Sequence, residues 1–185
     1  MALVVDAVPT SPTMNSFLTL AEANAYHEAR LHNTAWVGAT DAVKNAAIVW
    51  ATKQLCTLQW KGTRNIASQA LEHPRAGLSY SESGSSDYGA STDSTPWLYG
   101  IVTIPNDTVC QQVKDATAEL ALWLIQGDTT ANSGTEGFSR LKVDTIELEI
   151  KANDRPAWFQ DSVRNLVWRF ILNSNKYSAK TQRVG

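Results

Sequence analysis

Apolar side chains recur at the three-to-four-residue spacing of amphipathic helices in three stretches of the chain. The N-cap residue Thr40 precedes the first of them, and Pro105 and Pro156 stand near the start of the other two, where a first helical turn tolerates proline. Before these stretches, Thr19 and Glu22 have the spacing of a capping box, which indicates the start of a further helix. The pattern therefore predicts four helices, over about residues 20–31, 41–60, 104–127 and 154–172.

A fifth stretch alternates apolar and charged residues with the period of two that is typical of a β-strand. Its apolar positions are Leu141, Val143, Ile146, Leu148 and Ile150. The alternation breaks at residues 144–145, where a turn or a bulge would fit. We therefore expect a short strand or hairpin between the third and fourth helices.

Three segments lack apolar periodicity and are predicted to lie outside the helices. Residues 1–15 are expected to form an extended N-terminal arm, and residues 79–103 a long surface loop. Residues 176–185 are expected to form a C-terminal extension. The rest fits one mainly α domain over residues 1–175, a small bundle of about four helices with a short β-hairpin.

The composition changes this picture little. A chain of 185 residues can bury the core of one domain, and a net charge of -2 gives no global attraction to nucleic acid or membrane. The N-terminus lacks the basic start of a secretion signal, and no apolar run approaches the roughly 20 residues that span a bilayer. We therefore expect no membrane partner, and we expect Cys56 and Cys110 to be buried thiols.

Catalytic chemistry has no candidate residues in the sequence. The common nucleophile, phosphate-loop, dinucleotide and zinc-protease motifs are absent, and the carboxylates are scattered. His27 and His32 are five residues apart, which does not suit chelation from one helix face. The sequence predicts a protein that is not an enzyme and needs no metal or other cofactor.

One short segment combines aromatic and basic side chains. Trp60, Lys61 and Arg64 lie around the end of the second predicted helix, and Arg75 follows in a turn. Such a combination can stack bases and hold phosphates. Cations near a helix C-terminus are equally explained by the helix dipole, so both interpretations stay open.

Two further groups of residues are candidate contacts for a partner. The long loop carries aromatic side chains at Tyr80, Tyr88, Trp97 and Tyr99, and seven tryptophans in the chain favour interfaces as well as a core. The chain has no acidic residue after Asp161, and the extension is basic. It could be a solvated end, or it could dock on an acidic groove of a partner through Lys176, Tyr177, Lys180 and Arg183.

The order of several landmarks resembles a known family. In chain order they are Asn15–Phe17, Ala21–Tyr26, Trp36, Ala46–Ile48, Trp60–Arg64, the Pro74–Gly77 turn, Ile104–Pro105, Glu119–Ala121 and the late strand before the last helix. Together they resemble the head-to-tail connector, or adaptor, proteins of tailed phages. This group includes members described as DnaT-like single-stranded DNA-binding proteins. The resemblance covers about residues 1–171 and rests on order, since no single motif is diagnostic.

The resemblance implies a structural virion protein at the neck between head and tail, assembled in the host cytoplasm. Its partners would be further copies in a ring of about twelve subunits, the portal protein, and a downstream neck or tail protein. Double-stranded genomic DNA would pass through the lumen without specific contacts. The basic C-terminal extension, with Lys176, Tyr177, Lys180 and Arg183, would then dock on the portal.

The alternative function is a single-stranded DNA-binding module. The Trp60 to Arg75 segment is the feature that supports it. The net charge of -2 argues against it, because contacts between cations and phosphates supply most of the affinity of such proteins. On the sequence alone, the connector is the favoured hypothesis.

Overall fold

The computed structural model describes residues 3–81, 101–127, 140–143, 146–149 and 160–172. The helices are α1 (Leu20–Glu28), α2 (Thr34–Gly38), α3 (Asp41–Leu55), α4 (Gln111–Gln126) and α5 (Asp161–Val167). The strands are β1 (Thr63–Arg64), β2 (Arg75–Ala76), β3 (Ser79–Ser81), β4 (Ile101–Thr103), β5 (Arg140–Val143) and β6 (Ile146–Glu149). The prediction of a mainly helical domain with a short hairpin is confirmed.

Helix α1 begins as predicted and ends earlier. The Thr19 hydroxyl accepts a hydrogen bond from the Glu22 amide at 3.2 Å, and the Glu22 carboxylate accepts one from the Thr19 amide at 2.7 Å, which completes the capping box. The predicted end near residue 31 is wrong. The Asn33 side chain donates to the carbonyl of His27 at 2.6 Å, and His32 adopts a positive φ of 59°. The short helix α2 follows, which the periodicity did not predict.

Helix α3 begins at its predicted cap, where the Thr40 hydroxyl accepts from the Val43 amide at 3.4 Å. It ends at Leu55 and not near residue 60. The indole nitrogen of Trp60 donates to the Leu55 carbonyl at 3.0 Å, so a side chain takes an acceptor that the next helical turn would have used. The tertiary position of Trp60 therefore shortens this helix.

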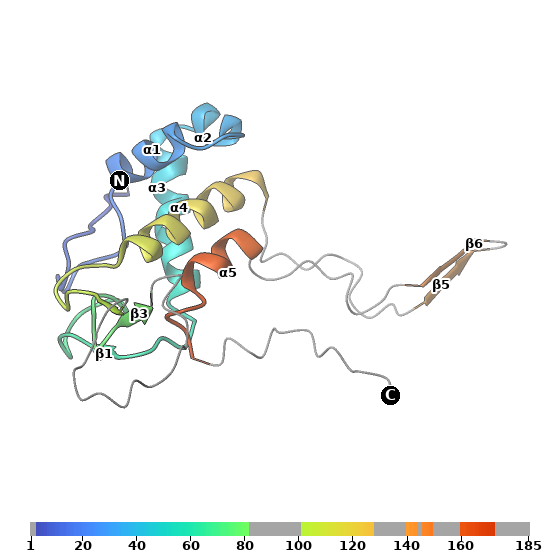
Figure 1. The fold of residues 1–185 in the computed structure, drawn as a ribbon. Helices are drawn as coiled ribbons and strands as arrows, with labels where there is room; N and C mark the ends of the chain where they lie inside the picture. The colour runs from blue at the N-terminus through green and yellow to red at the C-terminus, as the bar shows by residue number, and fades with distance from the viewer. Residues whose placement is uncertain (1–2, 82–100, 128–139, 144–145, 150–159, 173–185) are drawn as a thin grey trace, which may run out of the picture.

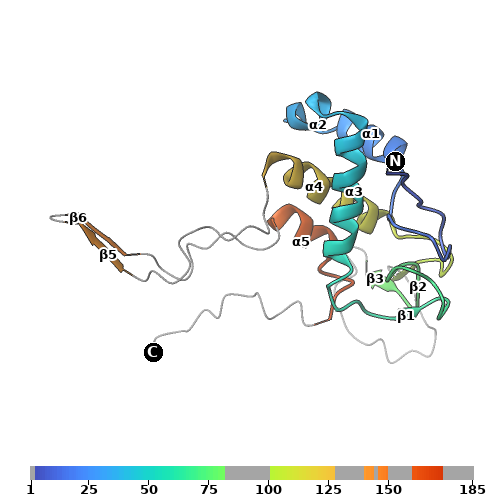
Figure 2. The ribbon, with the colours of Figure 1, turned by 180° about the vertical axis from the view of Figure 1, so that it is seen from behind.

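Helix α4 lies at the centre of the domain. It begins at Gln111, later than predicted, because the amide of Ile104 donates to the Leu78 carbonyl at 3.0 Å and so continues the β3–β4 pairing. It ends before Gly127, as predicted. Its residues 116–122 are all buried, and it packs against α3 and α5 and touches α1 and α2. Figures 1 and 2 show α4 crossing α3, with α5 beside α4.

The strands form antiparallel pairs. Strands β5 and β6 form the predicted hairpin, with Leu141 opposite Leu148 and Val143 opposite Ile146, and it stands apart from the helices in Figures 1 and 2. Strand β3 pairs with β4, so the two ends of the predicted 79–103 loop are in fact strands. Residues 82–100 between them lie outside the described residues.

Three other predictions fall wholly or partly outside the described residues. Helix α5 begins at Asp161, and the predicted start at residues 154–156 is not described. The extension over residues 176–185 and the domain boundary at 175 stay predictions. The N-terminal arm is described from Leu3, and it folds back where the Asp6 amide donates to the Asn15 side chain at 2.8 Å.

Among the described residues, no helix has the length and apolar character needed to cross a membrane.

Candidate nucleic-acid interface

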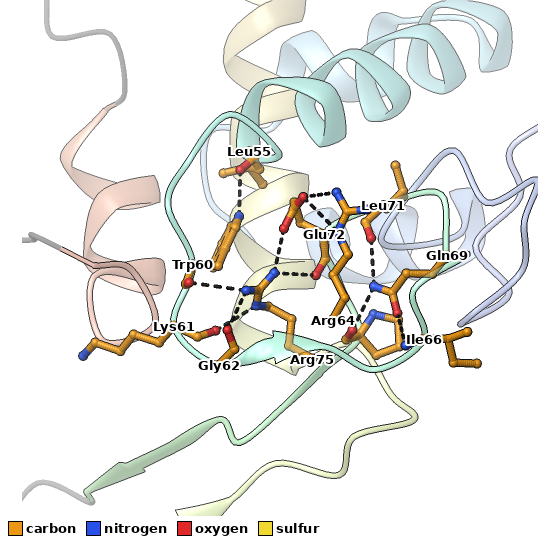
Figure 3. A network of polar contacts seen from close by, with 11 residues as sticks. Leu55, Trp60, Lys61, Gly62, Arg64, Ile66, Gln69, Leu71, Glu72 and Arg75 are labelled. Atoms are coloured by element: carbon orange, nitrogen blue, oxygen red, sulfur yellow. Dashed lines mark hydrogen bonds and ion pairs between the residues drawn. The ribbon is translucent and has the colours of Figure 1, made fainter.

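The structure brings together the four residues of the predicted basic and aromatic patch (Figure 3). Strands β1 and β2 pair Arg64 with Arg75, and Trp60 and Lys61 precede β1. The four side chains have different environments: Trp60 and Arg75 are buried, whereas Lys61 and Arg64 are exposed. The patch is therefore one spatial unit with an inner and an outer layer.

The inner layer supports the fold. Trp60 is 4% exposed, and its ring lies edge-on to His73 with the ring centres 4.4 Å apart. A nucleobase has no face of this indole to stack on. Arg75 is 8% exposed and donates to the main-chain carbonyls of Lys61 at 2.8 Å and Gly62 at 2.7 Å. Neither side chain is placed to contact DNA.

Glu72 joins the two arginines. Its carboxylate forms ion pairs with Arg75, at 2.6 Å, and with Arg64. Partial burial acts to raise the pKa of Glu72, but the hydrogen bonds and charges of Arg64 and Arg75 outweigh it and lower the pKa below its usual value. Glu72 therefore stays ionised at neutral pH and offsets part of the local positive charge.

Lys61 points away from this network, towards the segment that follows α5 (Figure 3). Its ammonium donates to the carbonyl of Arg169 at 2.8 Å. The backbone is joined at the same place, because the Lys61 amide donates to Phe170 at 2.7 Å and the Leu172 amide to Gln59 at 2.7 Å. The loop after α3 and the end of α5 thus form one short antiparallel contact.

At the Lys61–Arg169 contact lies a partly exposed group of aromatic and basic side chains. Trp168 is 47% exposed, and the guanidinium of Arg169 lies 5.4 Å from the centre of its ring. The same guanidinium lies 5.7 Å from the ring centre of Tyr80, which is half-buried on β3 and packs edge-on against Phe170. We call Lys61, Tyr80, Trp168 and Arg169 the Trp168 surface.

The predicted site residues are thus only partly assembled. Lys61 from the patch and Tyr80 from the aromatic loop meet at the Trp168 surface. Sequence reasoning missed Trp168 and Arg169 as a pair, although the apolar stripe of the last helix skips both positions. The other candidates, Tyr88, Trp97, Tyr99, Lys176, Tyr177, Lys180 and Arg183, lie outside the described residues.

A second exposed tryptophan has a similar neighbour. Trp50 on α3 is 44% exposed, and the Lys53 ammonium lies 5.9 Å from its ring centre. Here one cation accompanies one ring, whereas the Trp168 surface combines two rings and two cations from three segments of the chain.

Within the described ranges, no group of three or more His, Cys, Asp or Glu side chains could hold a metal ion.

The fold and these residues define the class of the protein: a small, mainly helical domain with an exposed aromatic and cationic surface. The chain matches the family model described as "Putative DnaT-like ssDNA binding protein" over residues 1–88 and 95–184. It belongs to this family. No curated protein and no solved structure gives a significant match to the chain.

The family assignment overturns the connector hypothesis. It points to single-stranded DNA and not to a portal-bound ring, so the predicted head-to-tail role, ring of copies, portal and tail partners, and passage of double-stranded DNA were wrong. The landmarks behind that hypothesis include Phe17, Trp36 and Trp60, which are core residues. Core residues report a shared fold and carry no information about a binding partner.

Proposed function

We propose that this protein binds single-stranded DNA through the Trp168 surface, as a binding module without catalytic activity. The family description supports the choice of ligand. The location of the binding site is supported by the exposed Trp168 ring, which lies beside the Arg169 guanidinium. The Lys61 ammonium donates a hydrogen bond to the main-chain carbonyl of Arg169.

The chemistry of this surface matches that of an unpaired strand. Every base has a π-face that can stack on an exposed indole, and stacking contributes about 1–3 kcal/mol per base. The bases of a duplex are stacked on each other and offer no such face along its length. Arg169, whose guanidinium lies over the Trp168 ring, and Lys61, which is bonded to the Arg169 carbonyl, would supply the cations for the phosphates that flank a stacked base, and a guanidinium also stacks on planar groups.

The net charge of the chain does not conflict with this role. A net charge of -2 sums over the whole sequence, whereas binding depends on the cations that one strand can reach. With two such cations, the affinity should fall with salt at a slope of about -1.4 in a plot of log K against log [salt], since each phosphate contact contributes about -0.7. The binding is therefore expected to be weak and salt-sensitive.

The test is fluorescence anisotropy of labelled oligo(dT) with the full chain, from about 50 to 200 mM salt. We expect the affinity to fall about sevenfold over that range. Trp168→Ala should lower the affinity at least about fivefold at constant salt, because it removes one stacked base. Duplex DNA of the same length should compete weakly.

Trp50→Ala is the matched control, because Trp50 has nearly the same exposure and also carries a cation over its ring. It should bind oligo(dT) like the unmodified protein. A larger loss from Trp50→Ala than from Trp168→Ala would move the site to α3. Absence of any binding at low salt would show that the proposed function is wrong.

A further inference from the structure

The guanidinium of Arg75 is engaged entirely by acceptors of the protein. A guanidinium has five N–H donors. Those of Arg75 meet five acceptors: the carbonyl oxygens of Trp60, Lys61, Gly62 and Glu72, and the Glu72 carboxylate. The distances range from 2.6 to 3.4 Å. With every donor engaged inside the protein, Arg75 has none to offer a phosphate.

Three of the five acceptors are consecutive. The carbonyls of residues 60, 61 and 62 all turn towards one guanidinium, which fixes the peptide planes on both sides of Lys61 (Figure 3). Gly62 adopts a φ of 71°, and a Cβ at this position would overlap the Ala76 carbonyl, so only glycine fits this close approach of β1 to β2. The loop therefore has little freedom to place Lys61 differently.

The direction of the Lys61 side chain follows from this arrangement. Its carbonyl faces Arg75, its amide donates to the Phe170 carbonyl, and its ammonium reaches the carbonyl of Arg169, whose guanidinium lies over the Trp168 ring. We infer that Arg75 is a positioning residue for single-stranded DNA binding, which holds the Trp60–Gly62 loop so that Lys61 meets the phosphate next to the stacked base. This inference rests on the proposed function.

The conservative variant Arg75→Lys separates positioning from charge. Lysine keeps the positive charge beside Glu72, but its three donors sit on one nitrogen at the end of a flexible stem, so it cannot meet the five acceptors that the three nitrogens of Arg75 reach. We expect the salt slope for oligo(dT) to shrink by about 0.7, the contribution of one phosphate contact. Lys61→Ala should shrink it by the same amount, and adding Lys61→Ala to Arg75→Lys should have no further effect.

Arg64→Lys is the matched control. Arg64 pairs with the same Glu72 but is exposed, and its guanidinium donates to the Glu72 carboxylate, so the salt slope of Arg64→Lys should stay unchanged. Amide hydrogen exchange of Arg75→Lys gives a second readout that does not depend on DNA. Exchange should accelerate at Lys61 and Leu172, whose amides join the two segments, while the amides of α4 stay protected.

The outcomes separate this inference from the proposed function. If Arg75→Lys keeps the full slope and Lys61→Ala still lowers it in that background, Arg75 does not position Lys61. Loss of protection throughout α4 would also overturn the inference, because Arg75 would then support the whole domain. If the unmodified protein does not bind, or Trp168→Ala has no effect, the proposed function fails whatever the exchange data show at Lys61.

Discussion

The Lys61 ammonium donates a hydrogen bond to the main-chain carbonyl of Arg169 at 2.8 Å, although the two residues are 108 positions apart in the chain. This bond lies where the loop after α3 meets the end of α5, and it joins Lys61 to the residue that follows the exposed Trp168. The end of α5 supplies one ring and one cation, and Lys61 and Tyr80 come to it from two other segments. The proposed site is therefore a product of tertiary packing.

Trp60 is predicted to stabilise the fold without contacting DNA. Trp60→Phe keeps an apolar ring but loses the hydrogen bond to the Leu55 carbonyl, which then accepts only from the Leu58 amide at 3.2 Å. We expect the free energy of unfolding to fall by about 0.5–1.5 kcal/mol in urea denaturation, the net contribution of one hydrogen bond. The oligo(dT) affinity of the folded variant should not change. A loss of affinity matching that of Trp168→Ala would place Trp60 at the interface and contradict its burial.

Glu119 should join α1 to α4 through its buried carboxylate. It is 6% exposed and accepts hydrogen bonds from the Tyr26 hydroxyl at 2.9 Å and the Arg30 guanidinium at 2.6 Å. Glu119→Gln should lower the free energy of unfolding by about 1.5–3 kcal/mol, because it weakens a charge-assisted pair. Glu28→Gln on the exposed side of α1 is the control and should stay within about 0.5 kcal/mol. Equal effects of the two variants would show that the Glu119 contacts add nothing.

His73 should make the fold sensitive to mild acid. Burial lowers its pKa to about 3, aided by the positive charge of Arg75 and opposed by Glu72, and neither ring nitrogen has a hydrogen-bond partner among the residues that the structure describes. The unfolded chain binds a proton near pH 6.5 that the folded chain does not take up until much lower pH. Stability is thus fully present above pH 6.5 and falls below it, by about 2 kcal/mol between pH 7.5 and 5.

The variant that checks this is His73→Phe, which keeps a ring between Phe17 and Trp60 but cannot be protonated. Urea denaturation at several pH values should show a smaller loss of stability on acidification. Part of the loss should remain, because burial also lowers the pKa of His27. An unchanged pH dependence between 7.5 and 5 would mean that His73 does not remain neutral in the folded protein.

Much of the fold could be predicted from local patterns, because apolar periodicity and caps act over a few residues. The capping box at Thr19 and Glu22, the cap at Thr40 and the β5–β6 hairpin are confirmed. The ends of α1 and α3 were misplaced because polar side chains just beyond each helix take its last carbonyls: Asn33 donates to the carbonyl of His27, and Trp60 to that of Leu55. Periodicity contains no information about such bonds.

The site was less predictable for the same reason. The sequence indicated a basic and aromatic segment with Trp60, Lys61, Arg64 and Arg75. Which of these side chains are buried depends on β2 and on the hydrogen-bond partners of Arg75. Trp168 looked like one more residue of an amphipathic helix. Its exposure follows from the way α5 packs against α4, which only the folded chain shows.

Photochemical cross-linking would locate the bound strand on the protein most directly. Oligo(dT) would be irradiated with the full chain at low salt, and the adducts mapped by mass spectrometry, with Trp168→Ala and Trp50→Ala run in parallel. We expect adducts on the peptides that contain Trp168 and Tyr80, lost in Trp168→Ala and retained in Trp50→Ala. Adducts confined to the peptide around Trp50, or unchanged by the loss of Trp168, would contradict binding at the Trp168 surface.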